Sequence, residues 1–311
     1  MGDIVVPTIV KPGELPAGFK AEDLGKFRLA VPEKNYHSDK TAVSQGALTW
    51  MEYSPAHFIH NWQQPYTEGG ASDVMKTGTL LHMALLEPHR WREKQVLPKF
   101  GDRRFKEAKA EYAAWLEAQP DAWVTLNDKG ERNGIKDTAP YISAEEKARV
   151  EAMAESVLSK RDLAALLKDA LTEATVYWVD EETRILQRAR LDIVSPAGII
   201  GDLKTCEDAR AVTFSKSIHN NSYDFQGGHY MAGANSTGGG YSDFVFGAVE
   251  RNPPYKAWGH VLVPRALERG KARRADALLR LRDCITTNTW PDYPDQLTPI
   301  DLPQYAYQVG G

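Results

Sequence analysis

The eight residues that decide the fold are GIIGDLKT, residues 198–205 of the chain. In a β-strand successive side chains point to opposite faces, so Asp202 and Lys204 share one face about 7 Å apart, whereas Ile199 and Leu203 share the other. The apolar neighbours are typical of a buried strand. The segment therefore predicts an acid and an amine that project together from a sheet.

The sequence before this strand predicts two more strands. ATVYWVD (174–180) and RILQRARLDIV (184–194) carry the strand pattern, and a short turn at 195–198 follows. A hairpin across that turn brings Asp192 near Asp202. Two carboxylates at this distance repel each other, and a bound divalent cation is the ordinary way to neutralise them. The alternative is a structural Asp202–Lys204 ion pair with Asp192 at a turn.

The remaining patterns surround this three-stranded meander with helices. Residues 1–35 contain four prolines and are expected to form an N-terminal arm, and residues 36–311 a single domain whose first half is mostly helical. Helical periodicity occurs at 44–62 with a break near Pro55, and at 75–88, 107–118, 143–171, 208–220, 222–234 and 265–283; two further strands are expected at 244–250 and 257–263. The predicted fold class is α/β, with a mixed central sheet flanked by helices.

Composition restricts the class of protein. The chain has 311 residues, 42% of them hydrophobic and 26% charged, and contains no apolar run long enough to cross a bilayer. Its first residues lack the basic start of a signal peptide, and two cysteines cannot build a disulfide framework or supply four ligands to an iron–sulfur cluster. We therefore expect a soluble cytoplasmic protein with no membrane partner.

Charge places a limit on nucleic-acid binding. The net charge is −4, whereas domains that bind nucleic acid mainly by electrostatics are usually strongly basic. Any DNA-binding surface must therefore be local. Two stretches qualify, at 265–283 with seven basic and three acidic residues and at 99–109 with five basic residues, although each also fits a solvated helix face. Signatures of dinucleotide-binding, P-loop, zincin and α/β-hydrolase sites are absent from the sequence.

Two helical segments add polar residues in unusual settings. His82 lies in GTLLHMALL, where apolar and small neighbours predict a buried ring. Such a histidine is more often a hydrogen-bonded core residue than a metal ligand, but a neutral imidazole facing two acids would complete a metal site. Gln226, with Tyr223 three residues before it and Tyr230 four residues after it, forms a polar-aromatic stripe on one helix face.

These residues, taken in order, resemble a known family. The sequence over roughly residues 34–306 is similar to the exonuclease VIII (RecE-type) branch of the PD-(D/E)xK nucleases, which is related to the lambda-type phage exonuclease. The matching positions are Tyr36-His37, Gly78-Thr79 with His82 and Glu87-Pro88, Glu173 ahead of Tyr177-Trp178, Arg190 with Asp192, Asp202-Leu203-Lys204-Thr205, Tyr223 with Gln226, and Trp290-Pro291.

The resemblance implies a role for each matched residue and a restriction-endonuclease-like core. Asp192, Asp202, His82 and the Leu203 carbonyl would bind Mg²⁺ or Mn²⁺. Lys204 would orient or activate the attacking water, Gln226 and Tyr223 would support the site or the DNA strand, and Glu173 would be accessory. His82 and Asp202 stand where many superfamily members have Glu, so the number and identity of the metal ions stay open. The candidate DNA contacts are Arg188, Arg190, Arg269, Lys271, Arg273 and Arg274.

The activity implied by the resemblance is a metal-dependent double-strand DNA exonuclease. It would resect one strand in the 5′ to 3′ direction and leave a 3′ overhang for a RecT-like single-strand annealing protein. The enzyme would act as a trimeric or tetrameric ring on DNA ends and would come from a phage or prophage in a bacterial host. Two alternatives stay open, a non-catalytic scaffold that binds DNA ends and a PD-(D/E)xK endonuclease.

Overall fold

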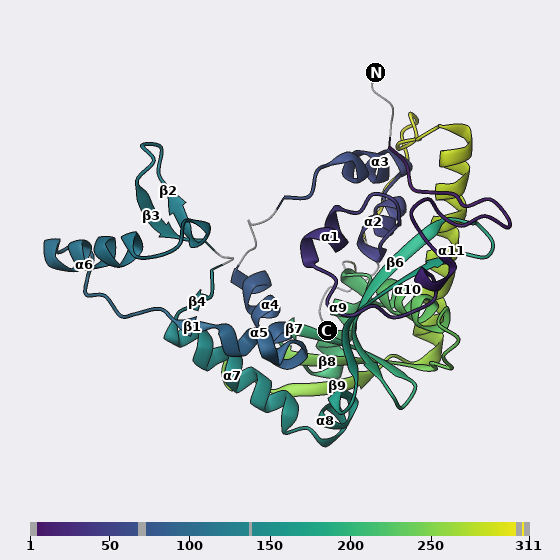
Figure 1. The fold of residues 1–311 in the computed structure, drawn as a ribbon. Coiled ribbons are helices and arrows are strands. Elements are labelled where there is room, and N and C mark those ends of the chain that lie inside the picture. The colour runs from purple at the N-terminus through teal and green to yellow at the C-terminus, as the bar shows by residue number, and fades with distance from the viewer. Residues whose placement is uncertain (1–4, 68–72, 137–138, 303–306, 308–311) are drawn as a thin grey trace.

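The computed structural model describes residues 5–67, 73–136, 139–302 and 307 of the chain (Figure 1). Its centre is a five-stranded sheet in the order β5-β6-β7-β8-β9. The strands are β5 (Leu171–Val179), β6 (Leu186–Ser195), β7 (Ile199–Cys206), β8 (Asp243–Glu250) and β9 (Ala257–Val261). β7 and β8 pair in parallel, and the other neighbours pair antiparallel, so the sheet is mixed and the predicted β5-β6-β7 meander is confirmed.

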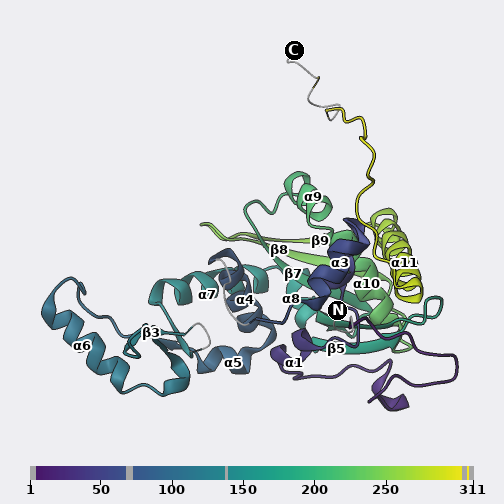
Figure 2. The same cartoon turned by 90° about the horizontal axis from the view of Figure 1, so that it is seen from above.

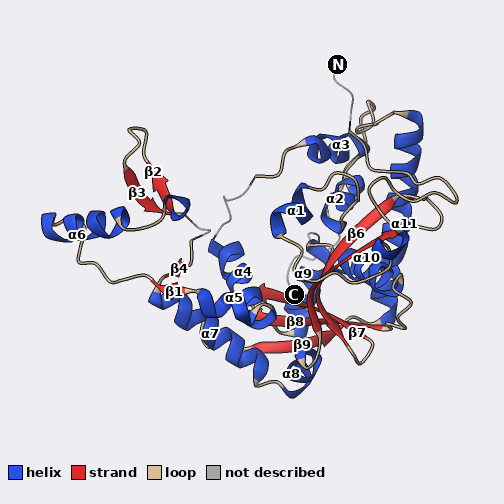
Figure 3. Cartoon of the chain, viewed as in Figure 1, coloured by secondary structure: helices blue, strands red, loops and turns tan. Residues whose placement is uncertain are grey.

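Helices cover both faces of this sheet (Figure 3). On one face lies α10 (Tyr223–Asn235), backed by α11 (Pro264–Thr287), and on the other lie α4 (Asp73–Leu86), α7 (Ala144–Leu158) and α8 (Arg161–Leu167). Gly201 of β7 permits the approach of α8, because a Cβ there would lie 2.7 Å from Leu166. The remaining α-helices are α1 (Glu33–Ser38), α2 (Gln45–Thr49), α3 (Pro55–Gln63), α5 (Pro88–Glu93), α6 (Lys106–Glu117) and α9 (Ala211–Asn220), and the 3₁₀ turns are η1 (Ala21–Asp23), η2 (Trp50–Glu52) and η3 (Asp121–Trp123).

The N-terminal segment packs along the outer edge of the sheet. Isolated bridges join Ile9 to Ile185 and Arg28 to Thr175, and Val10 is buried. At Thr175 this packing covers part of the open edge of β5, which would otherwise offer its backbone to other chains.

A small excursion, here called the satellite (residues 95–142), leaves the main body between α5 and α7 (Figure 1). It carries α6 and a hairpin of β2 (Val124–Leu126) and β3 (Arg132–Ile135), and at its base β1 (Gln95–Val96) pairs in parallel with β4 (Tyr141–Ile142). Its interior is an aromatic cluster of Phe100, Tyr112, Trp115, Trp123 and Tyr141.

Two expectations about the elements need correction. The helical pattern at 143–171 is two helices, α7 and α8, and Leu171 already begins β5, a strand whose centre is buried on both faces and therefore shows no alternation. The helical first half also contains the four short strands of the satellite, which the sequence patterns do not predict. Within the described residues, no helix combines the length and apolarity needed to cross a membrane.

Candidate active site

The sheet opens locally at the predicted acids. The β6–β7 ladder runs from Ser195↔Ile199 to Ile193↔Gly201, one residue short of Asp192 and Asp202. On the other side of β6, pairing with β5 is interrupted between Thr172↔Ile193 and Ala174↔Leu191. Glu173 fills that interruption with a left-handed backbone, at φ 50°. The backbone thus creates a gap between three neighbouring strands at the position where their carboxylates lie.

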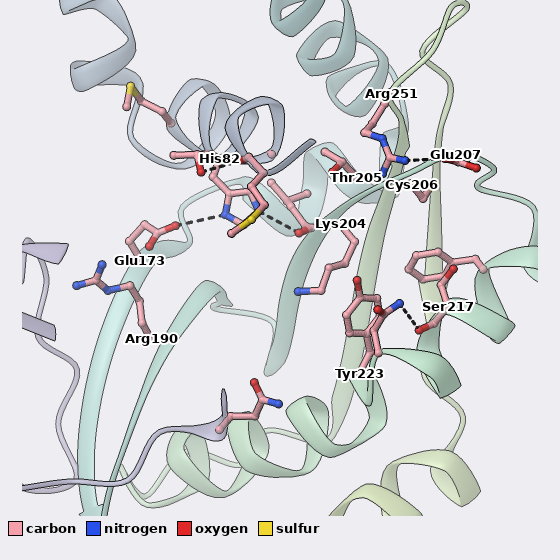
Figure 4. A pocket seen from close by; sticks show the side chains of 18 of the residues that line it. His82, Glu173, Arg190, Lys204, Thr205, Cys206, Glu207, Ser217, Tyr223 and Arg251 are labelled. Carbon is pink, nitrogen blue, oxygen red and sulfur yellow. Dashed lines mark hydrogen bonds and ion pairs between the residues drawn. The ribbon is translucent and has the colours of Figure 1, made fainter. Parts of the chain in front are cut away.

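Three of these side chains form a compact donor group. Ligand atoms of His82 from α4, Glu173 from β5 and Asp192 from β6 all lie within 4.8 Å of one another. His82 Nδ1 is 3.6 Å from Glu173 Oε1, and Nε2 is 3.7 Å from Asp192 Oδ2 and 2.9 Å from the Leu203 carbonyl oxygen. Figure 4 shows His82 and Glu173 facing each other in the pocket that Lys204 enters from β7. These are oxygen and imidazole donors of the kind that hold a divalent cation.

Asp202 is the centre of a second group beside the first. Its Oδ1 accepts a hydrogen bond of 2.8 Å from Gln226 Nε2 of α10, and its Oδ2 lies 2.6 Å from Lys204 Nζ. The Lys204 ammonium lies over the Tyr223 ring, 4.8 Å from the ring centre. Asp192 in turn accepts the Leu203 N–H at 2.9 Å. The alternation of side chains along the strand predicted that Asp202 and Lys204 lie on the same face of the sheet, and the structure confirms this. Gln226 and Tyr223 lie beside this pair.

Burial makes this concentration of negative charge costly. Burial raises the pKa of Asp202 to about 6, with Asp192 adding to the rise and Lys204 opposing it. Burial also raises the pKa of Asp192, opposed by His82 and assisted by Glu173. Burial lowers the pKa of His82, but Asp192, Glu173 and Asp202 outweigh it and bring the pKa to about 9. Because ionised carboxylates crowd one another here, the donor set fits a divalent cation that would neutralise them.

Lys204 stays charged in this environment. Burial lowers its pKa, but attraction to Asp202 and Asp192 outweighs that effect, so the pKa lies above the ordinary lysine value. Tyr230, one helical turn beyond Gln226, has a pKa well above its ordinary value because of burial and the nearby Asp192 and Asp202. Its phenol is therefore neutral, and it interacts with the Gln226 side chain.

The two groups adjoin a groove of about 1070 Å³, which His82, Glu173, Lys204 and Tyr223 line, whereas Asp192 and Asp202 are buried. One end is formed by α1, α4 and α5 and includes Glu33, His37 and Arg90. The other end is formed by α9 and the end of β8 and includes Ser217 and Arg251. Arg190 also lines the groove, while it donates to the Val31 carbonyl at 2.7 Å and stacks on Tyr36.

The structure assigns other predicted DNA contacts to internal packing. Arg188 is 4% exposed, donates to the carbonyls of Asp39 and Ala42, and is thus a core residue. Arg274 pairs with Asp180 and Gln187 beneath the surface. These two expectations are wrong, because buried guanidinium groups with protein acceptors cannot reach a phosphate.

The other cations of α11 also have protein partners. Arg269 and Arg273 both pair with buried Asp224, and Arg273 also pairs with Glu52. Lys271 pairs with Glu268 on the exposed face of the helix. The basic helix is therefore largely neutralised, in part by acids of other segments and in part by Glu268, Asp276 and Asp283 of the helix itself.

Sequence reasoning missed two features of the site. It gave Glu173 an accessory role from position alone, and the positive φ that turns its carboxylate toward His82 has no sequence signal. It treated Tyr230 only as part of a stripe, although its spacing from Gln226 could have indicated a shared site.

Comparisons with known proteins agree with this geometry. A family model described as a PDDEXK-like domain of unknown function (DUF3799) matches residues 44–302. The chain belongs to this PDDEXK-like family. A crystal structure of a "Putative exonuclease" from Eubacterium rectale is similar in fold, with a TM-score of 0.54 and 11% identity over 86% of this chain and 97% of that chain. No curated protein matches the sequence.

The family assignment confirms the predicted fold class and the PD-(D/E)xK nuclease superfamily. At 11% identity the structural likeness shows the fold alone. The exonuclease VIII branch therefore stays a prediction.

Proposed function

We propose that this protein is a metal-dependent exonuclease that hydrolyses double-stranded DNA from an end. The observation that carries the proposal is the donor group of His82, Glu173 and Asp192 next to the Asp202–Lys204 pair, adjoining an open groove that His82, Glu173 and Lys204 line. The PDDEXK-like family supports nuclease activity in general.

The residues that would hold the cation are His82, Asp192, Asp202 and the Leu203 carbonyl, with Glu173 as a further donor. Mg²⁺ is the expected ion, and Mn²⁺ also suits a mixed oxygen and imidazole set. When bound, the ion would lower the pKa of a water molecule and neutralise charge that develops on the scissile phosphate.

The chain's own residues would prepare that reaction. Lys204 presents a charged donor on the same strand face as Asp202, from which it can orient the attacking water or a phosphate oxygen. The hydrogen bond from Gln226 to Oδ1 would fix the Asp202 carboxylate, so that Oδ2 points toward Lys204. The Tyr223 ring would hold Lys204 in place, because the ammonium lies over the ring.

Single residues in the groove would position the DNA backbone. Arg90, which pairs with Glu87, and Arg190 lie toward one end, and Arg251, which pairs with Glu207, lies toward the other, so a strand crossing the site could meet a cation on either side of the scissile phosphate. Because of their place in the groove, these arginines are the proposed DNA contacts nearest the site. Arg269 and Lys271 would add electrostatic attraction only at the surface.

The finer parts of the proposal come from the family resemblance. We propose 5′ to 3′ resection that leaves a 3′ overhang, delivery of that overhang to a RecT-like annealing protein, and assembly as a trimeric or tetrameric ring. End-labelled linear duplexes test the polarity, since a 5′ label should be released before a 3′ label on the same strand.

One gel separates the proposed function from its alternatives. Linear and covalently closed duplexes are incubated with Mg²⁺ or EDTA, with Lys204→Ala as the inactive control. An exonuclease degrades only the linear duplex and only with Mg²⁺. An endonuclease also opens the closed circles, and a scaffold that binds DNA ends cleaves neither substrate, so either result would refute the proposal.

A further inference from the structure

Helix α9 lines one end of the groove with polar side chains that take no part in the proposed chemistry. Thr213, Ser217 and the C-capping residue Asn221 line the same groove as His82 and Lys204. Figure 2 shows α9 and α1 far apart, with the strands of the sheet between them, and both helices line the groove. A strand of substrate that lies along the groove over Lys204 therefore continues along α9.

The three polar side chains follow one face of the helix. Residues four apart on an α-helix are neighbours on its surface, and each step of four residues advances about 6 Å along the axis. Phe214, one residue after Thr213, is 1% exposed and packs in the core of the sheet, so the position of the helix is fixed. The row of side chains is thus held in place, and its advance is comparable to the spacing of successive phosphates in an extended nucleic-acid strand.

Two of the three side chains have hydrogen-bond donors to offer. Within the part of the chain that the structure describes, the Ser217 hydroxyl has no hydrogen-bond partner, and Asn221 uses one amide hydrogen for the Ser217 carbonyl at 2.9 Å and keeps the other. Thr213, in contrast, donates its hydroxyl to Asp208 Oδ2 at 2.7 Å, and Arg210 pairs with the same carboxylate. The row therefore offers donors at Ser217 and Asn221 and ends at Thr213.

This row lies close to the proposed position of the chemistry. The Tyr223 ring centre is 6.4 Å from that of Phe214 on α9 and 4.8 Å from the Lys204 ammonium, so one aromatic ring separates the helix from the lysine. Figure 4 shows Ser217 and Tyr223 on the side of the pocket opposite Glu173. When the scissile phosphate lies beside Lys204, the donors of α9 face the neighbouring phosphates of the same strand.

The charges at this end of the groove also favour phosphate. Arg251 lines the groove here, and its partner Glu207 lies 3.2 Å away with a side chain that is 81% exposed. An exposed ion pair of this kind contributes little to stability, so a phosphate can replace Glu207 at the guanidinium group. Hydroxyl, amide and guanidinium donors bind the DNA backbone and set its register without reading the base sequence.

We propose that Ser217 and Asn221 bind two successive phosphates of the strand that is cut, on one side of the scissile phosphate. The inference rests on the proposed function, because its ligand is the DNA strand in the groove. Asn221, two residues before Tyr223, binds the phosphate closer to the cut, and Ser217 binds the next one. Both residues position the strand and take no part in the chemical step.

Fluorescence anisotropy of a labelled linear duplex tests the contact, with Ca²⁺ in place of Mg²⁺ so that binding is measured apart from cleavage. Ser217→Ala should weaken binding about tenfold, the loss expected for one hydrogen bond to a charged phosphate. Ser215→Ala is the matched control on the same helix. It should bind like the wild type, because Ser215 lines a separate cavity beside Val261 and donates its hydroxyl to the Val212 carbonyl.

Duplexes with one uncharged methylphosphonate in place of a single phosphate identify the position of each contact. The effect of Ser217→Ala should disappear when the methylphosphonate stands at one particular linkage and persist when it stands elsewhere. The effect of Asn221→Ala should disappear at the adjacent linkage on the side of the cut, whereas a merely structural role of this cap would weaken binding of all the duplexes alike. Circular dichroism verifies that each variant is folded.

The outcomes separate this inference from the proposed function. If Ser217→Ala binds like Ser215→Ala, or if its effect persists at every linkage, the inference is overturned while the proposed function stands. A wild-type chain that binds no linear duplex overturns both.

Discussion

Helix α11 and the site where β5, β6 and β7 separate both concentrate charged side chains, but they differ in how those charges are compensated. In α11, Arg269, Arg273 and Arg274 pair with acids from distant parts of the chain, and Asp224 alone receives two guanidinium groups. At the open strand ends, Glu173, Asp192 and Asp202 share one imidazole and one ammonium. The comparison teaches that charge density in the sequence does not locate the site; uncompensated charge in the structure does.

The largest expected effect is on catalysis by Lys204. Because its ammonium lies 2.6 Å from Asp202 Oδ2, in the proposed position beside the attacking water, Lys204→Ala should lower single-turnover cleavage about 10²–10⁴-fold, as loss of a positioned proton-transfer group does. DNA affinity in Ca²⁺ should change little. Lys271→Ala on α11 is the matched control and should cleave at the wild-type rate. A collapse of affinity with normal cleavage of bound DNA would instead make Lys204 a phosphate clamp.

The second effect is on stability and distinguishes the two regions directly. Asp224 is 2% exposed and neutralises Arg269 and Arg273, so Asp224→Asn should lower the free energy of unfolding by about 3 kcal/mol. Asp192→Asn removes a repelling carboxylate and should change it by less than about 1 kcal/mol. Urea unfolding of both variants measures the difference. Equal losses in the two variants would contradict the proposed contrast.

The third effect is a pH dependence of metal binding. The pKa of Asp202 is raised to about 6, so above that pH the carboxylate is ionised and a cation relieves repulsion. The cation must also displace the proton that His82 holds up to a pKa of about 9, so metal affinity should already fall by up to about tenfold per pH unit below pH 9. As the pH falls through 6, Asp202 takes up a proton as well, and the fall should steepen by up to a further tenfold per pH unit. The rise in Tm caused by Mn²⁺ should therefore be larger at pH 7.5 than at pH 5, and Asp202→Asn should reduce that difference. A constant rise across this range would contradict a role for Asp202 as a ligand.

The smallest effect concerns the backbone at Glu173. A non-glycine residue at φ 50° costs about 1 kcal/mol, so Glu173→Gly should stabilise the metal-free protein by about that amount while weakening Mn²⁺ binding. Glu173→Gln keeps a side chain at the left-handed backbone position and removes the charge. It should therefore weaken Mn²⁺ binding without the increase in stability that glycine gives. Thermal unfolding and titration calorimetry measure both quantities. Destabilisation by glycine would show that the left-handed backbone is not strained.

The sequence predicted those features that depend on local periodicity. Alternation in 198–205 placed Asp202 beside Lys204, and the short turn after β6 placed Asp192 near them. It could not predict that Arg188 and Arg274 are buried, since their partners Asp39, Ala42 and Asp180 belong to segments brought together only by folding. It also could not predict the satellite, whose strands are two to four residues long and whose core is a few aromatic rings.

The parallel pairing at the base of the satellite has an evolutionary consequence. Gln95 lies opposite Tyr141 and Val96 opposite Ile142, so the chain leaves the main body and returns to it at adjacent points. A segment with neighbouring ends can be gained, lost or exchanged without moving the elements on either side of it. Homologous genes should therefore differ in length mainly between α5 and α7, while the spacing from β5 to β8 stays nearly constant. The satellite can therefore vary as a unit, whereas the strands from β5 to β8 must keep their spacing because they carry the candidate active site.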